Sequence, residues 1–271
     1  MTKLNKIIYS ILLLLIILLF YLIAKDKLKS KLYMKEYNYF NGIQIVTLNI
    51  NNEKIFNKID NLYKEYEMLI DTSENYNNVK DLNYIKNNNS SDKYITIDKK
   101  LYDMIQYGLD MYKLTKGAID ISKNNYTDES NIDKIILKDN NKILNNHVNI
   151  NLDEIKEEYI NKQIEKLLKD NRVKKYAINM NDTILVSSKG IKTAIPDPDN
   201  ELKILKTINM DYKCTATINN INFSKYKSVT VSSNDNCESI AKMIMLNDNV
   251  NISDIKASIY VYTKDKKIIK Y

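Results

Sequence analysis

Residues 94–121, YITIDKKLYDMIQYGLDMYKLTKGAIDI, hold a predicted strand, helix and turn in one continuous stretch. The alternating run 94–97 predicts a short strand that ends at Asp98. Apolar side chains then recur at helical spacing, at Leu101, Met104, Ile105, Leu109 and Tyr112. This spacing predicts an amphipathic helix with one buried stripe. Gly117 can adopt the left-handed conformation that ends a helix, and Asp120 follows the turn. Taken alone, the stretch is more typical of a capped core helix followed by a solvated carboxylate.

The flanking sequence alternates helical and strand patterns without an internal repeat. Apolar periodicity predicts further helices at 53–70, 153–169 and 236–246. Strand patterns lie at 43–50, 135–137, 148–152, 176–180, 183–187, 202–208, 213–218, 227–232 and 257–263. Asn181 and Asp182 favour a hairpin between the fourth and fifth of these. The sum predicts an α+β domain of antiparallel strands with helices inserted among them.

Two polar segments are expected to be irregular. Residues 71–93 are rich in Asn, Ser and Asp and lack an apolar period, so we expect a long loop. Both prolines of the chain lie in 195–199, IPDPD, which predicts a rigid exposed turn.

The N-terminal residues predict a membrane segment. Residues 7–24 contain no charged side chain, and a helix of that length spans roughly 27 Å, close to the thickness of the bilayer hydrocarbon. A cleaved signal peptide is the alternative, but no small-x-small cleavage pair follows the apolar run. We therefore expect a basic N-terminus at 1–6, an anchor at 7–24, a juxtamembrane linker at 25–37 and one domain at 38–271.

The charges do not favour nucleic acid as a partner. The net charge is +7, and basic and acidic side chains alternate along the chain instead of gathering into a basic stripe. By the positive-inside rule, the lysines at 25–35 would keep the domain in the cytoplasm. Cys214 and Cys237 form either one disulfide or two isolated buried thiols, and we expect the single histidine, His147, to be a surface residue.

The order of landmarks over residues 38–250 resembles the ApbE-like family, the FAD:protein FMN transferases. The family's T-x-G-A-F-D is mirrored by residues 115–120, TKGAID, and its L-G-G-I-A-K-G-Y by residues 152–159, LDEIKEEY. Further matches are residues 41–43, NGI, with M-G-T; residues 82–83, LN, with the end of S-E-L-x-x-L-N; residues 179–182, NMND, with N-x-G-G; and residues 237–242, CESIAK, with A-D-A-L-A-T.

The resemblance implies a T-fold-related, mixed antiparallel sheet with packed helices, and a magnesium-dependent transfer of FMN from FAD to a Thr or Ser of a partner flavoprotein. It implies flavin contacts at Thr115, Gly117, Ala118, Asp120 and Asn179. It also implies metal ligands at Glu238 and at the backbone carbonyl of Lys156. An extracytoplasmic domain at the cell membrane is implied as well, which conflicts with the lysines at 25–35.

Several site positions depart from the family pattern. Carboxylates at residues 153, 154, 157 and 158 replace the glycines and the lysine that would approach a pyrophosphate. Lys242 takes the place of the threonine at i+4 from the metal-binding acid, and an i,i+4 Glu–Lys pair is typical of a helix surface. We therefore expect a membrane-anchored relative that binds FAD weakly, with magnesium in doubt and little or no transfer. The alternatives are an active transferase with a non-standard metal site and a purely structural relative.

Overall fold

The computed structural model describes residues 31–271 apart from 75, 77, 89, 127, 182, 189, 220, 222, 223 and 248. The expected anchor at 7–24 lies outside the described residues. Among the helices of the described part, none is long and apolar enough to cross a membrane.

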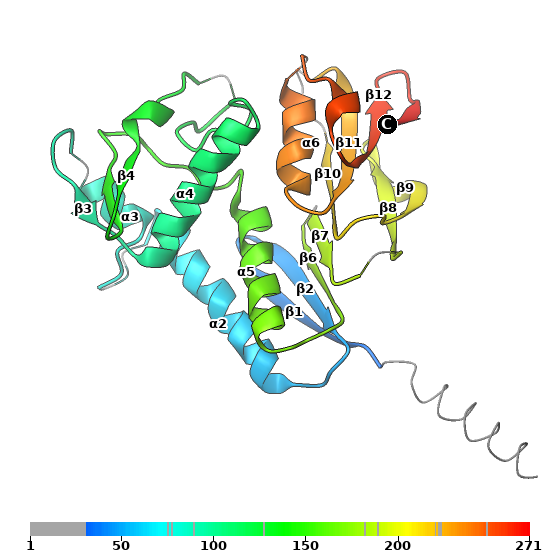
Figure 1. The fold of residues 1–271 in the computed structure, drawn as a ribbon, viewed down its shortest axis with the longest axis horizontal. Helices are drawn as coiled ribbons and strands as arrows, with labels where there is room; N and C mark the ends of the chain where they lie inside the picture. Colours follow the sequence, from blue (N-terminus) through cyan, green and yellow to red (C-terminus); the bar gives the residue numbers. More distant parts are fainter. Residues whose placement is uncertain are drawn as a thin grey trace, which may run out of the picture.

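The core of the fold is an eight-stranded sheet in which every neighbouring pair is antiparallel (Figure 1). In spatial order its strands are β1 (Tyr33–Tyr39), β2 (Gly42–Leu48), β6 (Tyr176–Met180), β7 (Thr183–Val186), β10 (Cys214–Asn219), β11 (Tyr226–Ser233), β12 (Ser258–Thr263) and β13 (Ile268–Lys270). The predicted α+β class and the hairpin at Asn181 are confirmed.

Three helices pack on the sheet, namely α2 (Glu53–Ile70), α5 (Lys156–Asp170) and α6 (Cys237–Leu246). Helix α6 lies against β10 and β11, while α5 contacts α2, α6, β6 and β7. Apolar side chains of these helices and of the sheet form one continuous core, which includes Ile59, Ile160 and Ile244. The apolar residues at helical spacing in the sequence are therefore the ones that these helices bury against the sheet.

A separate hairpin of β8 (Lys192–Asp197) and β9 (Asn200–Asn209) forms a smaller cluster, in which Ile195 and Ile208 pack with Tyr260 of β12. The expected exposed proline turn is therefore wrong in part. Pro196 lies within β8 at a shift in register, and Asp197 is buried. Proline is tolerated there because β8 pairs with β9 alone and has an unpaired edge.

The opening stretch lies at the end of α2, and its buried side chains, such as Leu101 and Ile105, belong to the same core (Figure 1). It consists of β3 (Ile95–Thr96) and α4 (Lys99–Leu114), and β3 pairs with β5 (Lys142–Leu144), which pairs with β4 (Ile136–Lys138). Helix α4 approaches the next segment closely at Gly108, where an added Cβ would lie 2.7 Å from the Ile121 side chain. The predicted strand–helix–turn order is confirmed.

Three local expectations are corrected by the structure. The loop 71–93 contains a short helix, α3 (Leu82–Asn87), whose N-terminus is capped by Asp81. Residues 148–152 form no strand, although Val148, Ile150 and Leu152 are buried alternately. Strand β1 starts at Tyr33, inside the stretch 25–37 that we assigned to a linker. A six-residue helix is too short to show a helical period in the sequence. An extended segment that packs without pairing has the same alternation as a strand, so the sequence does not separate the two.

Candidate functional site

The turn after α4 is built by Thr115, Lys116 and Gly117. Lys116 and Gly117 have φ values of 54° and 84°, and the Gly117 amide donates to the Tyr112 carbonyl at 2.8 Å. The Thr115 hydroxyl donates to the Met111 carbonyl at 2.7 Å and accepts from the Ile119 amide at 3.0 Å. Thr115 is fully buried, so its hydroxyl joins the helix end to the turn. Thr115 does not line the cavity described next, and its flavin contact stays a prediction.

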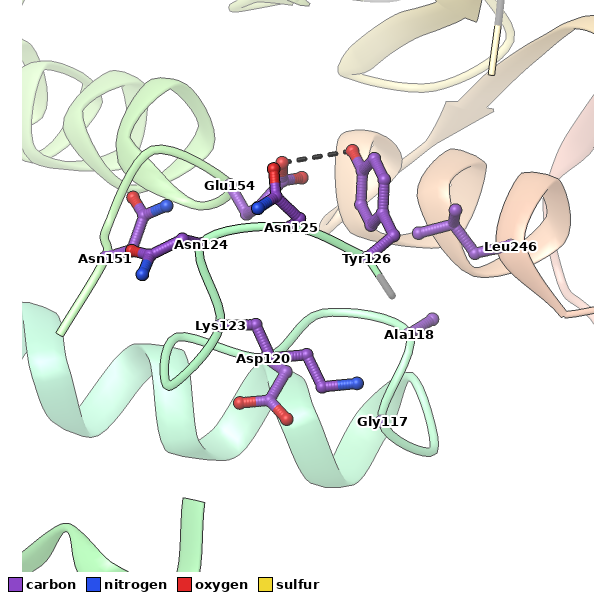
Figure 2. Close-up of a pocket in the computed structure, with 10 residues that line it drawn as sticks. All are labelled: Gly117, Ala118, Asp120, Lys123, Asn124, Asn125, Tyr126, Asn151, Glu154 and Leu246. Atoms are coloured by element: carbon purple, nitrogen blue, oxygen red, sulfur yellow. Dashed lines mark hydrogen bonds between the residues drawn. The ribbon is translucent and has the colours of Figure 1, made fainter. Parts of the chain in front are cut away.

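A cavity of about 330 Å³ opens between this turn and the end of α6 (Figure 2). It is lined by Gly117, Ala118, Asp120, Lys123, Asn124, Asn125, Tyr126, Asn151, Glu154 and Leu246. Three of the five predicted flavin contacts therefore line one cavity: Gly117, Ala118 and Asp120. Asn179 lies on β6 and does not line it, although its Oδ1 is buried without a partner among the described residues.

Asp120 is the most distinctive group at this cavity. Its side chain is only 5 % exposed, and its Oδ1 accepts from the Ser122 amide at 2.9 Å and the Ser122 hydroxyl at 2.6 Å. Its Oδ2 has no hydrogen-bond partner among the described residues. A buried carboxylate oxygen is normally hydrogen-bonded, so this atom is an acceptor available to a ligand.

Glu154 joins the cavity to α6. Its Oε1 accepts a hydrogen bond from the Tyr126 hydroxyl at 3.0 Å, as the dashed line in Figure 2 shows. Burial and the neighbouring Glu154 charge together raise the pKa of Tyr126 to about 12. The tyrosine therefore remains a donor to this carboxylate at neutral pH.

On the other side of Glu154, the Lys242 ammonium is enclosed by oxygens. Its Nζ lies 2.7 Å from the Glu154 carbonyl, 3.0 Å from Glu154 Oε2 and 2.8 Å from Glu238 Oε1. Burial alone would lower the pKa of Lys242, but the charges of Glu238 and Glu154 outweigh it and raise the pKa above its usual value. Lys242 is therefore a buried, charged ammonium ion.

The Glu238–Lys242 pair was expected at a helix surface, and that expectation is wrong. The two residues are only 3 % and 8 % exposed, because α6 presents this side to the core and to the segment before α5. The second oxygen of Glu238 accepts from the Thr183 hydroxyl at 3.0 Å. Both oxygens of this carboxylate are thus engaged.

The residues present do not fit a divalent metal ion. Lys242 already contacts the Glu238 oxygen that we predicted as a ligand, and the carbonyl beside it belongs to Glu154 instead of Lys156. Lys156 begins α5, and its ammonium pairs with Asp153 at 2.6 Å. Among the described residues, no group of three or more His, Cys, Asp or Glu side chains is arranged to hold a metal ion.

A second buried carboxylate, Glu158, lies next to this pair and is only 4 % exposed. It accepts from the Tyr107 hydroxyl and, at 3.0 Å each, from the amide and hydroxyl of Ser239 in the first turn of α6. Burial and the nearby Glu238 charge raise the pKa of Glu158, although Lys162 opposes this. Glu158 therefore supplies the N-terminal cap that Asn236, the N-cap residue, does not provide.

Sequence reasoning missed Glu158, Tyr107 and Tyr126 as members of this network.

The start of α6 is also fixed covalently, because Cys214 of β10 and Cys237 of α6 form a disulfide with Cα atoms 6.1 Å apart. The disulfide is therefore the alternative that the structure adopts for the two cysteines. His147 is exposed, as predicted.

Known proteins resemble this chain in sequence and in fold. The ApbE family model matches residues 42–224. No curated protein matches the chain. Among solved structures, the ApbE protein of Thermotoga maritima superposes with a TM-score of 0.71 at 12 % identity, covering 89 % of this chain and 97 % of its own.

Two further structures are similar. The flavin transferase ApbE of Vibrio cholerae has a TM-score of 0.69 at 11 % identity and covers 89 % of this chain and 96 % of its own. The apo flavinyl transferase ApbE of Pseudomonas stutzeri has a TM-score of 0.71 at 9 % identity and covers 89 % of this chain and 95 % of its own. These likenesses show the shared fold. Since the family model matches well over half of the sequence, the chain belongs to the ApbE family.

Proposed function

We propose that this chain is a membrane-anchored flavin-nucleotide-binding protein of the ApbE family that carries out little or no FMN transfer. The observation that supports binding is Asp120, whose Oδ2 is buried at a cavity without a partner among the described residues. Leaving such a group unpaired costs about 1–3 kcal/mol, which a ligand donor would recover. FAD carries hydroxyl and ring N–H donors of this kind.

Weak transfer is supported by the segment 152–159. At the positions of the family's glycines, Glu154 and Glu158 place carboxylates in the region expected to approach a pyrophosphate. Glu154 is partly exposed at the cavity, where it contacts Lys242 and Tyr126, and Glu158 is buried against Ser239 and Tyr107. Phosphoryl transfer depends on neutralising charge at phosphate, and added carboxylates act against that.

The membrane anchor is proposed from the apolar segment 7–24. An extracytoplasmic domain is supported by the Cys214–Cys237 disulfide, because disulfides persist in oxidising compartments. The flanking lysines favour the opposite orientation. Labelling of an introduced surface cysteine in intact cells, with a membrane-impermeant reagent, distinguishes the two orientations.

The test of binding is a titration of the full-length chain in detergent micelles with FAD, followed by flavin fluorescence. Asp120→Asn keeps an oxygen for Ser122 but replaces the free acceptor with a donor, so we expect about tenfold weaker binding. Asp110→Asn, on the exposed side of α4, is the matched control and should bind as the wild type does. Equal affinity of all three proteins, or no binding by the wild type, would refute the proposed site.

The test of transfer mixes the protein with an acceptor flavoprotein, FAD and magnesium, and measures the acceptor by mass spectrometry. We expect no added FMN mass over the time in which an active flavin transferase labels the acceptor fully. Labelling at a comparable rate would show instead that the chain is an active transferase with a non-standard site.

A further inference from the structure

The contacts of Lys242 resemble those of a metal ion more than those of a typical surface lysine. Its Nζ is surrounded by one backbone carbonyl at 2.7 Å and by two carboxylates, those of Glu238 at 2.8 Å and Glu154 at 3.0 Å. Oxygen donors of this kind are the ligands that hard divalent cations prefer. The same set of oxygens therefore suits either an ammonium or a divalent ion.

We propose that the Lys242 ammonium permanently takes the place of a divalent cation, and that the oxygens of Glu154 and Glu238 bind such an ion once the lysine is removed. Without a cation, the two carboxylates would place two negative charges next to each other, and the single ammonium of Lys242 neutralises one of them. The inference concerns the cation at the proposed flavin site, but its readouts contain no flavin and do not depend on flavin binding.

The oxygens are held in position by groups other than Lys242. Thr183 donates to Glu238 Oε2, and Tyr126 donates to Glu154 Oε1, each at 3.0 Å. Because each carboxylate has its own second partner, the cluster is expected to persist when the lysine side chain is shortened. Glu154 also lines the 330 Å³ cavity, which gives a dissolved ion a route to the site.

The substitution changes what the site can do. An ammonium has three N–H donors, and here two of them form hydrogen bonds while Glu154 Oε2 lies in ion-pair contact at 3.0 Å. A divalent ion takes six or more ligands and would keep positions open for phosphate oxygens. Lys242 therefore supplies one charge but no open coordination position, and its side chain is only 10 % exposed, so we expect any nucleotide binding to be independent of divalent ions.

The distances favour a large ion after substitution. Calcium–oxygen distances are about 2.3–2.6 Å and magnesium–oxygen distances about 2.0–2.1 Å. The oxygens around Lys242 would move inward less for calcium or for terbium, which resembles calcium, than for magnesium. Terbium is a suitable probe because nearby tyrosine, here Tyr126, sensitises its emission.

The experiment uses the full-length chain in detergent micelles as wild type, Lys242→Thr, Lys242→Met and Lys169→Met. Lys169 forms the matched i,i+4 pair with Glu165 at 2.8 Å on α5, but its side chain is 52 % exposed. Tyrosine-sensitised terbium emission and the melting temperature, with calcium or with EDTA, are measured for each. Glu238→Gln, made alone and added to the Lys242→Thr protein, removes one proposed ligand in each background.

We expect no saturable terbium emission and no effect of EDTA or calcium for the wild type and Lys169→Met. Both Lys242 variants should bind one ion, with a rise in melting temperature of about 5 °C at calcium concentrations near 100 times Kd. Glu238→Gln should abolish this gain. Variants that fold only when calcium is present would also support the proposal.

Two results would overturn it. One is saturable ion binding by the wild type that Glu238→Gln removes, since the site would then accept a metal alongside Lys242. The other is the absence of ion binding by both Lys242 variants, whether they fold or remain unfolded in every divalent ion tried.

Discussion

The Tyr107 hydroxyl donates a hydrogen bond to Glu158, a carboxylate buried between α5 and α6. The bond connects α4, which ends at the turn of Thr115 to Gly117, to α5, and the same carboxylate accepts two hydrogen bonds from Ser239 at the start of α6. Glu158 is therefore a shared acceptor that links α4 and α6 through α5.

The Tyr107–Glu158 bond should contribute to stability. Tyr107→Phe removes one donor to a buried carboxylate, and we expect the free energy of unfolding to fall by about 1–3 kcal/mol. Urea unfolding of the full-length chain measures it. Tyr102→Phe, on the same helix, is the control and should change stability by less than about 0.5 kcal/mol; a similar loss for both would show that the bond is not responsible.

Glu158 should also give stability a dependence on pH. Burial and the Glu238 charge raise the folded-state pKa of Glu158 above the ordinary value of 4.5 that it has in the unfolded chain, so between pH 4.5 and the folded-state pKa the folded protein binds more protons than the unfolded chain. The contribution of Glu158 to stability is thus fully present below pH 4.5 and is lost as pH rises through the folded pKa. Glu158→Gln should remove this pH dependence of the unfolding free energy.

The measurement is the difference in unfolding free energy between Glu158→Gln and the wild type at several pH values from 4 to 8. Taking the difference cancels the other titrating groups. We expect it to shift in favour of Glu158→Gln as the pH rises; a flat or opposite trend would contradict the raised pKa.

Gly108 should not tolerate a larger residue. An alanine Cβ would lie 2.7 Å from Ile121 and 3.2 Å from Ile155, and such overpacking typically costs 1–3 kcal/mol. Alanine's helix propensity returns about 1 kcal/mol, so we expect a net loss of up to about 2 kcal/mol for Gly108→Ala. Thermal unfolding measures this, and the loss should shrink in an Ile121→Ala background, where the clash is removed. An unchanged loss would rule out that clash as the cause.

Periodicity predicted the elements whose apolar side chains face one core. Helices α2 and α4 begin and end within a residue or two of the predicted bounds, because each has a series of apolar side chains at helical spacing, which includes Ile59 in α2 and Leu101 in α4. The depth of the Glu238–Lys242 pair was not predictable, since an i,i+4 pair has the same spacing at a surface and in a core. Glu158 was equally hidden, because its partners Tyr107 and Ser239 are distant in sequence.

The Cys214–Cys237 disulfide should stabilise the start of α6. It closes a loop with a sequence separation of 23, for which the chain-entropy model gives about 3 kcal/mol. We expect the Cys214→Ser, Cys237→Ser double variant to lose about that amount in urea unfolding. A reductant should lower the stability of the wild type alone; equal responses of the two proteins would mean that the bond is absent.

Thr115 should be needed for the turn and not for the ligand. Thr115→Val keeps the shape of the side chain but removes the hydroxyl that joins Met111 O to the Ile119 amide, leaving a buried amide unpaired. We expect a loss of about 1–3 kcal/mol in unfolding free energy. Thr115→Ser, which keeps the hydroxyl, should retain most of the stability.

Because Thr115 is fully buried, the FAD affinity of the folded Thr115→Val protein should match that of the wild type. Asp120→Asn should instead weaken FAD binding without a comparable loss of stability. If Thr115→Val instead weakens FAD binding while remaining as stable as the wild type, the hydroxyl contacts the flavin, as the family resemblance implied.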